Sequence, residues 1–347
     1  MAVGLALEYR SRLALHRHVC WCSASPVDEP AIPPFDPDRV ERLPVASFNQ
    51  RLVPLKLGRF YPARILDKTS VEGRRFRVIA IDNEVFVADF NHPLASQEIV
   101  HAQEQLDGGA VGRVEMLLQW AGMDAPLADA DTQFDDPNAL ERGDPGDDAG
   151  FYARPRCVMH IDHACAARIT ALYASILAPG AQVLDLMSGW RSHMPQHVGP
   201  AIGLGMNAEE MGDNPQLAEH VVHDLNREPM LPFSDATFDA VVNTVSFEYL
   251  TRPGAVLGEL YRVLRPGGVL AVVFSNRYFP PKAVRLWTRL HSMECVGWVL
   301  QQLHRAGFAD LHTRVEQGLR RPADDSYAER LDEMDPLFAV WGRRPDG

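Results

Sequence analysis

Apolar and polar positions follow two different patterns along this chain of 347 residues. In the second half, apolar runs of strand length are separated by segments long enough for a helix, as in Gln182–Leu186, Ala201–Asn207 and Phe238–Asn243. Strands that alternate with helices are typical of a parallel sheet covered on both faces. Residues 151–347 are therefore predicted to form a doubly wound, mostly parallel α/β domain, with Pro336–Arg343 as a final antiparallel edge strand.

The first third of the chain contains shorter, alternating runs. Arg77–Ile81 and Val85–Phe90 are separated by Asp82-Asn83, and such a pair between two alternating runs predicts a β-hairpin. Leu5–Leu13 also alternates, which favours a strand. We therefore expect a small β-rich domain over residues 1–118.

The extreme N-terminus has a second interpretation. Met1–Cys22 carries Arg10, Arg12 and Arg17 with a single acid, Glu8, and this composition suits an organelle transit peptide. We prefer the strand and expect a cytoplasmic protein, while targeting by this arginine-containing segment stays open as the alternative.

The two regions are joined by a segment rich in Asp, Pro and Gly. Residues 124–150 contain almost nothing apolar enough to fold. We predict an acidic linker over residues 119–150.

Composition narrows the class of protein. A hydrophobic content of 46% in 347 residues is that of a soluble protein with two parts. The net charge of −12 argues against a nucleic-acid partner bound through a broad basic surface, because phosphates require clustered Lys and Arg. No apolar run is long enough to cross a bilayer. The five cysteines include no CxxC pair, which favours a reducing compartment.

An ordered series of short motifs runs through the second region. An apolar run ends in Asp185 and is followed by a Ser188-Gly189 turn, and a second apolar run follows at the spacing of a βαβ unit. The later members are, in order, His223-Asp224-Leu225, Leu231-Pro232-Phe233, Phe238–Asn243 and Leu264–Gly268. The series resembles the class I S-adenosylmethionine-dependent methyltransferases, and this resemblance implies S-adenosyl-L-methionine as cofactor.

The resemblance implies roles for the first loop. Asp185 would face the amino group of the cofactor's methionine part, and Ser188 and Gly189 would lie in the loop that approaches it. The three-glycine turn of the family is reduced in this chain, because Met187 and Arg191 occupy its first and third positions.

The end of the second strand also departs from the family. An acid there binds both ribose hydroxyls in the relatives, whereas this chain has Gly205. Asn207 would bond one hydroxyl while Met206 packs on the adenine, and Asp224 with the backbone N–H of Leu225 would contact the adenine edge. A neutral amide in place of the acid would weaken binding by roughly 1 kcal/mol or more.

Acceptor-side groups are expected after the fourth strand. Asn243 is counted among the cofactor contacts, and Glu248 or Tyr249 is a candidate base, with a packing wall as the alternative for the aromatic ring. His160 precedes the helix before the first strand and is a candidate lid group or base. Asp162 is interpreted as the N-cap of that helix.

The histidine pairs His160/His163 and His193/His197 do not indicate a metal. Their spacing suits a helix, but no set of cysteines or carboxylates completes four ligands, so we predict no metal site. Asn276–Pro281 is interpreted as part of a lid that shapes acceptor specificity.

The N-terminal region carries its own resemblance. Asp38–Phe48 and Val85–Ala95 are similar to the domain inserted in the flap of SlyD-group FKBP-type prolyl isomerases, which implies contact with peptides. Between Val27 and Phe35 there is no room for the segment that forms most of the isomerase pocket, so isomerase activity is not expected. A peptide-contacting module and a docking platform both fit this region.

Together these features predict methyl transfer from S-adenosylmethionine to a small-molecule acceptor, with neither nucleic acid nor membrane as partner. The alternative is a peptide-binding, chaperone-like or scaffold protein whose methyltransferase domain binds cofactor without turnover. Possible peptide or protein contact is assigned to the N-terminal domain.

Overall fold

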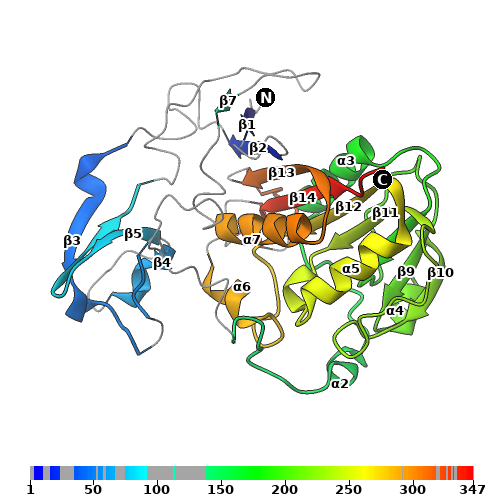
Figure 1. Cartoon of the computed structure of the whole chain (residues 1–347), viewed down its shortest axis with the longest axis horizontal. Helices are drawn as coiled ribbons and strands as arrows, with labels where there is room; N and C mark the ends of the chain where they lie inside the picture. Colours follow the sequence, from blue (N-terminus) through cyan, green and yellow to red (C-terminus); the bar gives the residue numbers. More distant parts are fainter. Residues whose placement is uncertain are drawn as a thin grey trace.

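The computed structural model describes residues 4–10, 16–23, 35–51, 54–57, 60–66, 75–91, 112–113, 138–290, 292–317, 321–325, 327–329, 331 and 334–346. Their strands form a ten-stranded sheet and a four-stranded sheet (Figure 1). The strand order of the larger sheet is β10-β9-β8-β11-β12-β14-β13-β2-β1-β7.

The predicted α/β region supplies the first seven strands in that order. Their bounds are Val183–Leu186 for β8, Ala201–Gly205 for β9, Leu217–Val222 for β10, Phe238–Thr244 for β11, Leu264–Phe274 for β12, Ala309–Gln317 for β13 and Leu337–Arg343 for β14. The pairings from β10 to β12 are all parallel, and β14 is antiparallel to both of its neighbours. The prediction of a mostly parallel, doubly wound sheet is confirmed.

Strand β14 is antiparallel, as predicted, but it does not lie at an edge. It is inserted between β12 and β13, pairing Val272 with Val340 on one side and Thr313 with Val340 on the other. The pattern of a single strand shows its burial but not its neighbours, and β14 is buried because its side chains alternate between the two cores of the sheet.

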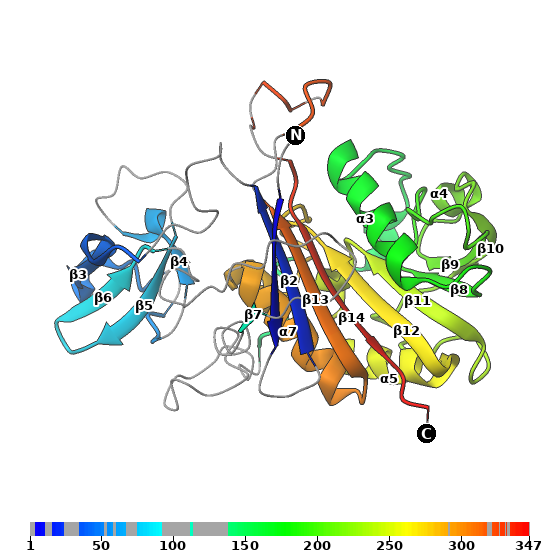
Figure 2. The ribbon, with the colours of Figure 1, turned by 90° about the horizontal axis from the view of Figure 1, so that it is seen from above.

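The helices cover both faces of this sheet, and Figure 2 shows α3 and α5 on opposite sides. The helices of this region are α2 (Asp148–Tyr152), α3 (His163–Ile176), α4 (Ala208–Gly212), α5 (Pro253–Val263), α6 (Arg285–Arg289) and α7 (Ser292–Arg305). Leu184 packs in one core with side chains of α5 and α7, whereas Val183 packs in another core with α3. Successive strand residues point to opposite faces, so one apolar run serves both cores.

The N-terminal strands belong to the larger sheet. Strand β1 (Gly4–Arg10) pairs antiparallel with β2 (His16–Ser23), and β2 pairs in parallel with β13. The short strand β7 (Gly112–Arg113) pairs with β1. A strand around residue 9 is therefore present as predicted. We expected this strand to belong to one β-rich domain with the rest of residues 1–118. It joins the larger sheet through β2, because the outer edge of β13 is open for pairing with β2.

The four-stranded sheet is antiparallel and has its own core. Its order is β3-β6-β5-β4, with bounds Val40–Pro44, Val85–Asp89, Arg75–Ile81 and Phe60–Pro62. The predicted hairpin joins β5 to β6, and Asp82 Oδ1 accepts the backbone N–H groups of Glu84 and Val85 in its turn. The fully buried rings of Phe76 and Phe86 form the centre of the core. This sheet accounts for the alternating pattern of the first third.

Part of the expected linker is folded. Arg142 forms an ion pair of 2.7 Å with Asp148, and both side chains are more than nine-tenths buried. Buried Lys282 adds a second cation 3.2 Å from Asp148. An acidic segment is expected to stay exposed to solvent when no cation lies close to its carboxylates. Here the two cations Arg142 and Lys282 compensate the charge of Asp148, so this part of the segment can fold. Residues 119–137 lie outside the described residues.

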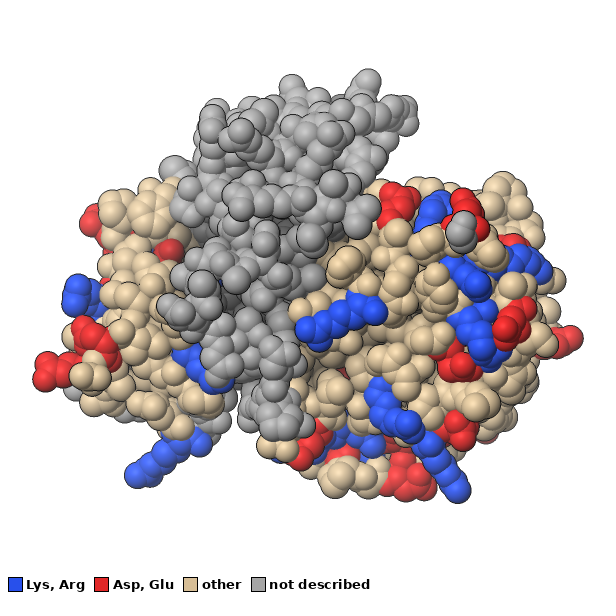
Figure 3. All heavy atoms as spheres, in the orientation of Figure 1, with Lys and Arg blue, Asp and Glu red and all other residues tan. Residues whose placement is uncertain are grey.

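On the face drawn in Figure 3, acidic and basic side chains of the described residues are interspersed. Within the described residues, no helix is both long and apolar enough to cross a membrane.

Candidate functional site

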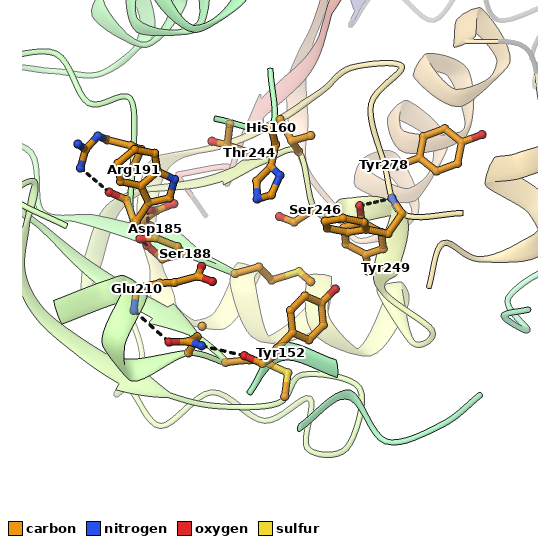
Figure 4. Close-up of a pocket in the computed structure, with 18 of the residues that line it drawn as sticks. Tyr152, His160, Asp185, Ser188, Arg191, Glu210, Thr244, Ser246, Tyr249 and Tyr278 are labelled. Carbon is orange, nitrogen blue, oxygen red and sulfur yellow. Dashed lines mark hydrogen bonds between the residues drawn. The ribbon is translucent and has the colours of Figure 1, made fainter. Parts of the chain in front are cut away.

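A cavity of about 530 Å³ lies beyond the carboxyl ends of β8, β9, β10 and β11. Figure 4 shows side chains that line it. Nine of the residues singled out from the sequence are among the lining residues: His160, Asp185, Ser188, Gly189, Met206, Asn207, Asp224, Leu225 and Tyr249. Parallel strands place their carboxyl-end loops at one edge of the sheet, which brings these distant residues together.

The loop after β8 forms one wall of the cavity. Ser188 Oγ donates a 2.6 Å hydrogen bond to Asp185 Oδ2, and the Asp185 side chain is buried. Burial raises the pKa of Asp185 to about 7. Met187 has a φ of 58°, in the left-handed region that favours glycine. The loop therefore keeps a glycine-like conformation at the position where the family has glycine.

Gly205 ends β9 beside this loop, and the backbone there is tightly packed. A Cβ atom on Gly205 would lie 2.2 Å from the carbonyl oxygen of Ser188. The Ser188 N–H donates to the Leu204 carbonyl at 2.9 Å, which fixes the two segments against each other. Position 205 therefore has no room for any side chain, acidic or not.

Asn207 lines the cavity, but its amide is engaged within the protein. Its Oδ1 accepts the backbone N–H groups of Glu209 and Glu210, both at 3.0 Å, as the N-cap of α4. Its Nδ2 donates to the Tyr152 carbonyl at 2.8 Å. The expected bond from Asn207 to a ribose hydroxyl is not supported by this arrangement, because an N-cap residue directs its side chain to its own helix.

The loop after β10 forms the side assigned to adenine. Asp224 Oδ1 accepts the backbone N–H groups of Asn226 and Arg227, at 2.9 and 3.2 Å, so one carboxylate oxygen braces its own turn. Leu225 is buried at the cavity wall, and Met206 lines the same cavity. The roles assigned to these three residues in adenine binding stay predictions.

His160 and Tyr249 line the opposite side of the cavity. The Phe279 N–H donates to Tyr249 Oη at 2.9 Å, and burial raises the pKa of the Tyr249 hydroxyl far above its usual range. Burial therefore disfavours the ionised form of the Tyr249 hydroxyl, and its role as a base or as a packing wall stays a prediction. Partial desolvation lowers the pKa of His160, so its imidazole is neutral and able to accept a proton.

Two predicted site residues lie outside the cavity. Glu248 is fully buried, neither of its carboxylate oxygens has a hydrogen-bond partner within the described part of the chain, and burial raises its pKa to about 8. Asn243 is also fully buried, and its Nδ2 donates to the Leu186 carbonyl and to Ser246 Oγ. Neither residue is among those that line the cavity. Side chains alternate between the two faces of a strand, and Asn243 falls on the face turned away from the cavity. Glu248 lies in a one-turn 3₁₀ helix, and its side chain is likewise turned away from the cavity.

The cavity also contains residues that sequence reasoning did not single out as site residues. Asp148 comes from the segment expected to be linker, Tyr152 from the start of the α/β region, Glu210 from α4, and Tyr327 from the connection between β13 and β14. The helix N-cap pattern at Asp147 could have identified the first segment, since its side chain accepts the Ala149 N–H. No comparable local signal marks Tyr327.

Part of the α/β region is similar in sequence to known proteins. Residues 197–272 match the family model described as a methyltransferase domain. A ubiquinone/menaquinone biosynthesis C-methyltransferase of Roseobacter denitrificans is 33% identical over 102 residues, which cover 29% of this chain and 40% of that protein. A demethylmenaquinone methyltransferase of Beutenbergia cavernae is 35% identical over 111 residues, covering 30% of this chain and 45% of that protein. The chain thus spans less than half the length of these relatives.

Two bacterial proteins are among the solved structures to which part of this chain is similar. The YcgJ protein of Bacillus subtilis is 14% identical with a TM-score of 0.38, covering 54% of this chain and 100% of that chain. A possible histamine N-methyltransferase of Thermotoga maritima is 16% identical with a TM-score of 0.39, covering 52% of this chain and 90% of that chain.

The chain therefore contains an S-adenosylmethionine-dependent methyltransferase domain, and S-adenosylmethionine is the cofactor of this class. The cavity fits this cofactor chemically. Buried Asp185 suits the ammonium group of the methionine part, and apolar Met206 and Leu225 suit the adenine ring. The matched residues give no support to the resemblance of the N-terminal region to prolyl isomerases, which stays a prediction.

Proposed function

We propose that this protein transfers the methyl group of S-adenosylmethionine to a small planar acceptor. The observation that carries the proposal is a single cavity that joins the Asp185–Gly189 loop to a wall containing His160 and Tyr249. Cofactor and acceptor can therefore meet in one cavity, as an in-line displacement at the sulfonium requires.

The wall assigned to the acceptor is rich in aromatic side chains. Tyr249 and Phe279 are stacked with ring centroids 6.1 Å apart, and Tyr278 and Tyr327 line the same cavity. Aromatic rings bind planar apolar bodies through area burial and stacking. Arg277 lines the cavity with its guanidinium 5.1 Å from the centroid of the Tyr327 ring and 3.9 Å from Asp335. A cation at this wall favours an acceptor with an anionic substituent.

His160 is the proposed proton acceptor. Its ring and that of Phe279 form a T-shaped contact with centroids 5.6 Å apart, which holds the imidazole at the acceptor wall. The cofactor supplies an electrophilic methyl group. When the nucleophile of the acceptor carries a proton, that proton would pass to the neutral imidazole while the nucleophile takes the methyl group, the bond from sulfur to methyl breaks and S-adenosylhomocysteine leaves. His160→Gln is expected to lower the rate of methyl transfer by about 100-fold or more without changing cofactor affinity.

The first test is calorimetric titration of the full chain with S-adenosylmethionine and S-adenosylhomocysteine. Micromolar binding that Asp185→Ala and Asp224→Ala both abolish would support the cofactor site, and a screen of planar acceptors by radiolabelled methyl transfer would follow. Absence of binding by the intact protein would contradict the proposal, because Met187 and Gly205 would then have removed the pocket's affinity.

For the four-stranded sheet, we propose a role in contact with peptides or proteins, on its resemblance to the insert domain of SlyD-group isomerases. Asn91 has buried side-chain atoms that bond the backbone of Asp36, so this residue braces the unit. His92 and Pro93 of the same motif lie outside the described residues. Suppression of the aggregation of a reduced model protein by the full chain would support this role. If the full chain does not suppress aggregation, the sheet is better described as a structural platform.

A further inference from the structure

We propose that Glu210 is the carboxylate that binds the ribose hydroxyls of the cofactor. The inference rests on the proposed use of S-adenosylmethionine and goes further by naming a residue of α4 in place of one at the end of β9. Three observations lead to it, and each concerns one position near that strand end.

The first observation concerns Gly205, the last residue of β9. A Cβ atom here would lie 2.2 Å from the Ser188 carbonyl oxygen and 3.0 Å from Met211 Sδ. The first of these atoms belongs to the backbone of the cofactor loop and cannot move as a flexible side chain would. No hydroxyl-binding side chain can therefore project from this strand end.

The second observation concerns Asn207. Its amide oxygen accepts two backbone N–H groups of α4, and its amide nitrogen donates to the Tyr152 carbonyl. A ligand hydroxyl could bond this amide only by displacing one of these bonds, which the helix start and the Tyr152 segment both need. Asn207 is thus a structural link between α4 and Tyr152.

The third observation is the position of Glu210 itself. It lines the cavity, and its Oε2 lies 3.2 Å from the point where a Cβ on Gly189 would be, directly beside the cofactor loop. Figure 4 shows Glu210 in the cavity close to Ser188 and Asp185. The carboxylate therefore lies beside the loop that approaches the methionine part, in the same cavity as Met206.

The Glu210 carboxylate is also oriented. Its Oε1 accepts the Arg156 N–H at 2.6 Å, whereas Oε2 has no hydrogen-bond partner among the described residues. One oxygen thus anchors the group and the other keeps its lone pairs for a ligand. The ammonium group of the methionine part is already assigned to Asp185, and the vicinal hydroxyls are donors that suit a second carboxylate, because hydrogen bonds to an ionised group are about twice as strong as neutral ones.

The binding experiment uses the full chain, S-adenosylhomocysteine and its 2′,3′-dideoxyribose analogue. Glu210→Gln keeps an oxygen for the Arg156 N–H but removes the charge, and Glu209→Gln is the matched control on the exposed side of the same helix. The Glu210 variant is expected to bind S-adenosylhomocysteine about tenfold more weakly or worse. It is expected to bind the dideoxy analogue as tightly as the unmodified chain does, and the Glu209 variant is expected to match the unmodified chain with both ligands.

The outcomes separate this inference from the proposed function. If the unmodified chain binds S-adenosylhomocysteine and Glu210→Gln loses the same affinity for both ligands, the contact is not with the hydroxyls and the inference is wrong. The same holds if the variant keeps full affinity for S-adenosylhomocysteine. If the unmodified chain binds neither ligand, the proposed function fails and the inference fails with it. Equal affinity of variant and unmodified chain for the analogue shows that the variant is folded.

Discussion

Arg321 Nη1 lies 3.1 Å from Asp162 Oδ2, and this buried ion pair links the connection between β13 and β14 to the start of α3. Arg321 also pairs with Asp335 at 2.8 Å, while Asp162 caps α3 by accepting the Cys165 N–H. Arg321 pairs with Asp325 at 3.0 Å as well, so one guanidinium compensates three carboxylates whose side chains are largely buried. The N-cap role predicted for Asp162 is confirmed, but its ion pair joins residues far apart in the chain.

Removal of the guanidinium is expected to destabilise the fold. Arg321→Met leaves Asp162 and Asp335 buried with less compensating charge, and loss of one partner of a buried pair typically costs about 3–5 kcal/mol. Urea unfolding followed by circular dichroism measures this change. Arg343→Met, at an exposed pair with Asp310, is the control and should lie within about 0.5 kcal/mol of the unmodified chain. Equal stability of both variants would contradict the prediction.

A side chain at Gly205 is expected to damage the fold rather than improve cofactor affinity. Gly205→Asp would restore the acid of the family, but its Cβ meets the Ser188 carbonyl at 2.2 Å. We expect a loss of at least about 2 kcal/mol in the free energy of unfolding, the range typical of overpacking. Gly212→Ala is the control, because the nearest atom to its added Cβ is 4.0 Å away. A stable Gly205→Asp chain with tighter S-adenosylhomocysteine binding would refute the steric argument.

Glu248 should make stability depend on pH. Its pKa is about 8 in the folded state, above the usual value of 4.5, because burial disfavours the charged form. The folded state therefore holds this proton over a pH range in which the unfolded state has released it. Stability contributed by this group is present below about pH 4.5 and is lost as pH rises towards 8.

Glu248→Gln tests this dependence. The variant removes the titration, so its stability relative to the unmodified chain is expected to rise between pH 5 and 8, by an amount on the order of a few kcal/mol. Thermal or urea unfolding across that range is the measurement, and exposed Glu209→Gln should show no such trend. A difference between Glu248→Gln and the unmodified chain that stays constant with pH would show that Glu248 is ionised at neutral pH.

Cofactor affinity should also depend on pH through Asp185. The pKa of Asp185 is raised to about 7 by burial, and only the ionised carboxylate pairs with the ammonium group of the methionine part. Binding of S-adenosylhomocysteine is therefore expected to tighten as pH rises from 6 to 8. Asp185→Asn should bind more weakly and lose most of the pH dependence in the same calorimetric titration. Parallel pH profiles for the two proteins would exclude Asp185 as the titrating group.

The sequence alone was sufficient for features that depend on neighbouring residues. The alternation of buried strands with helices predicted the doubly wound sheet, Asp82-Asn83 predicted the hairpin, and Asp162 predicted a helix start. Asp185 and Ser188 also reached the cavity as expected, because a parallel strand carries its following loop to a known edge of the sheet. Backbone hydrogen bonding and side-chain periodicity act over a few residues, so a local pattern is enough to specify them.

Other features were decided by contacts between distant segments. Ser188 packs so closely against Gly205 that no acidic side chain fits at the position where the relatives bind the ribose. The side chain of Asn207 is used to cap α4. Glu210 is then the carboxylate that lies beside Gly189. Pairing of Arg142 with Asp148 folded a segment whose composition suggests a linker. The insertion of β14 and the extension of the sheet by β2 likewise depend on which edges are open. Such outcomes depend on steric fit and charge compensation between residues far apart in sequence, so only the tertiary structure could decide them.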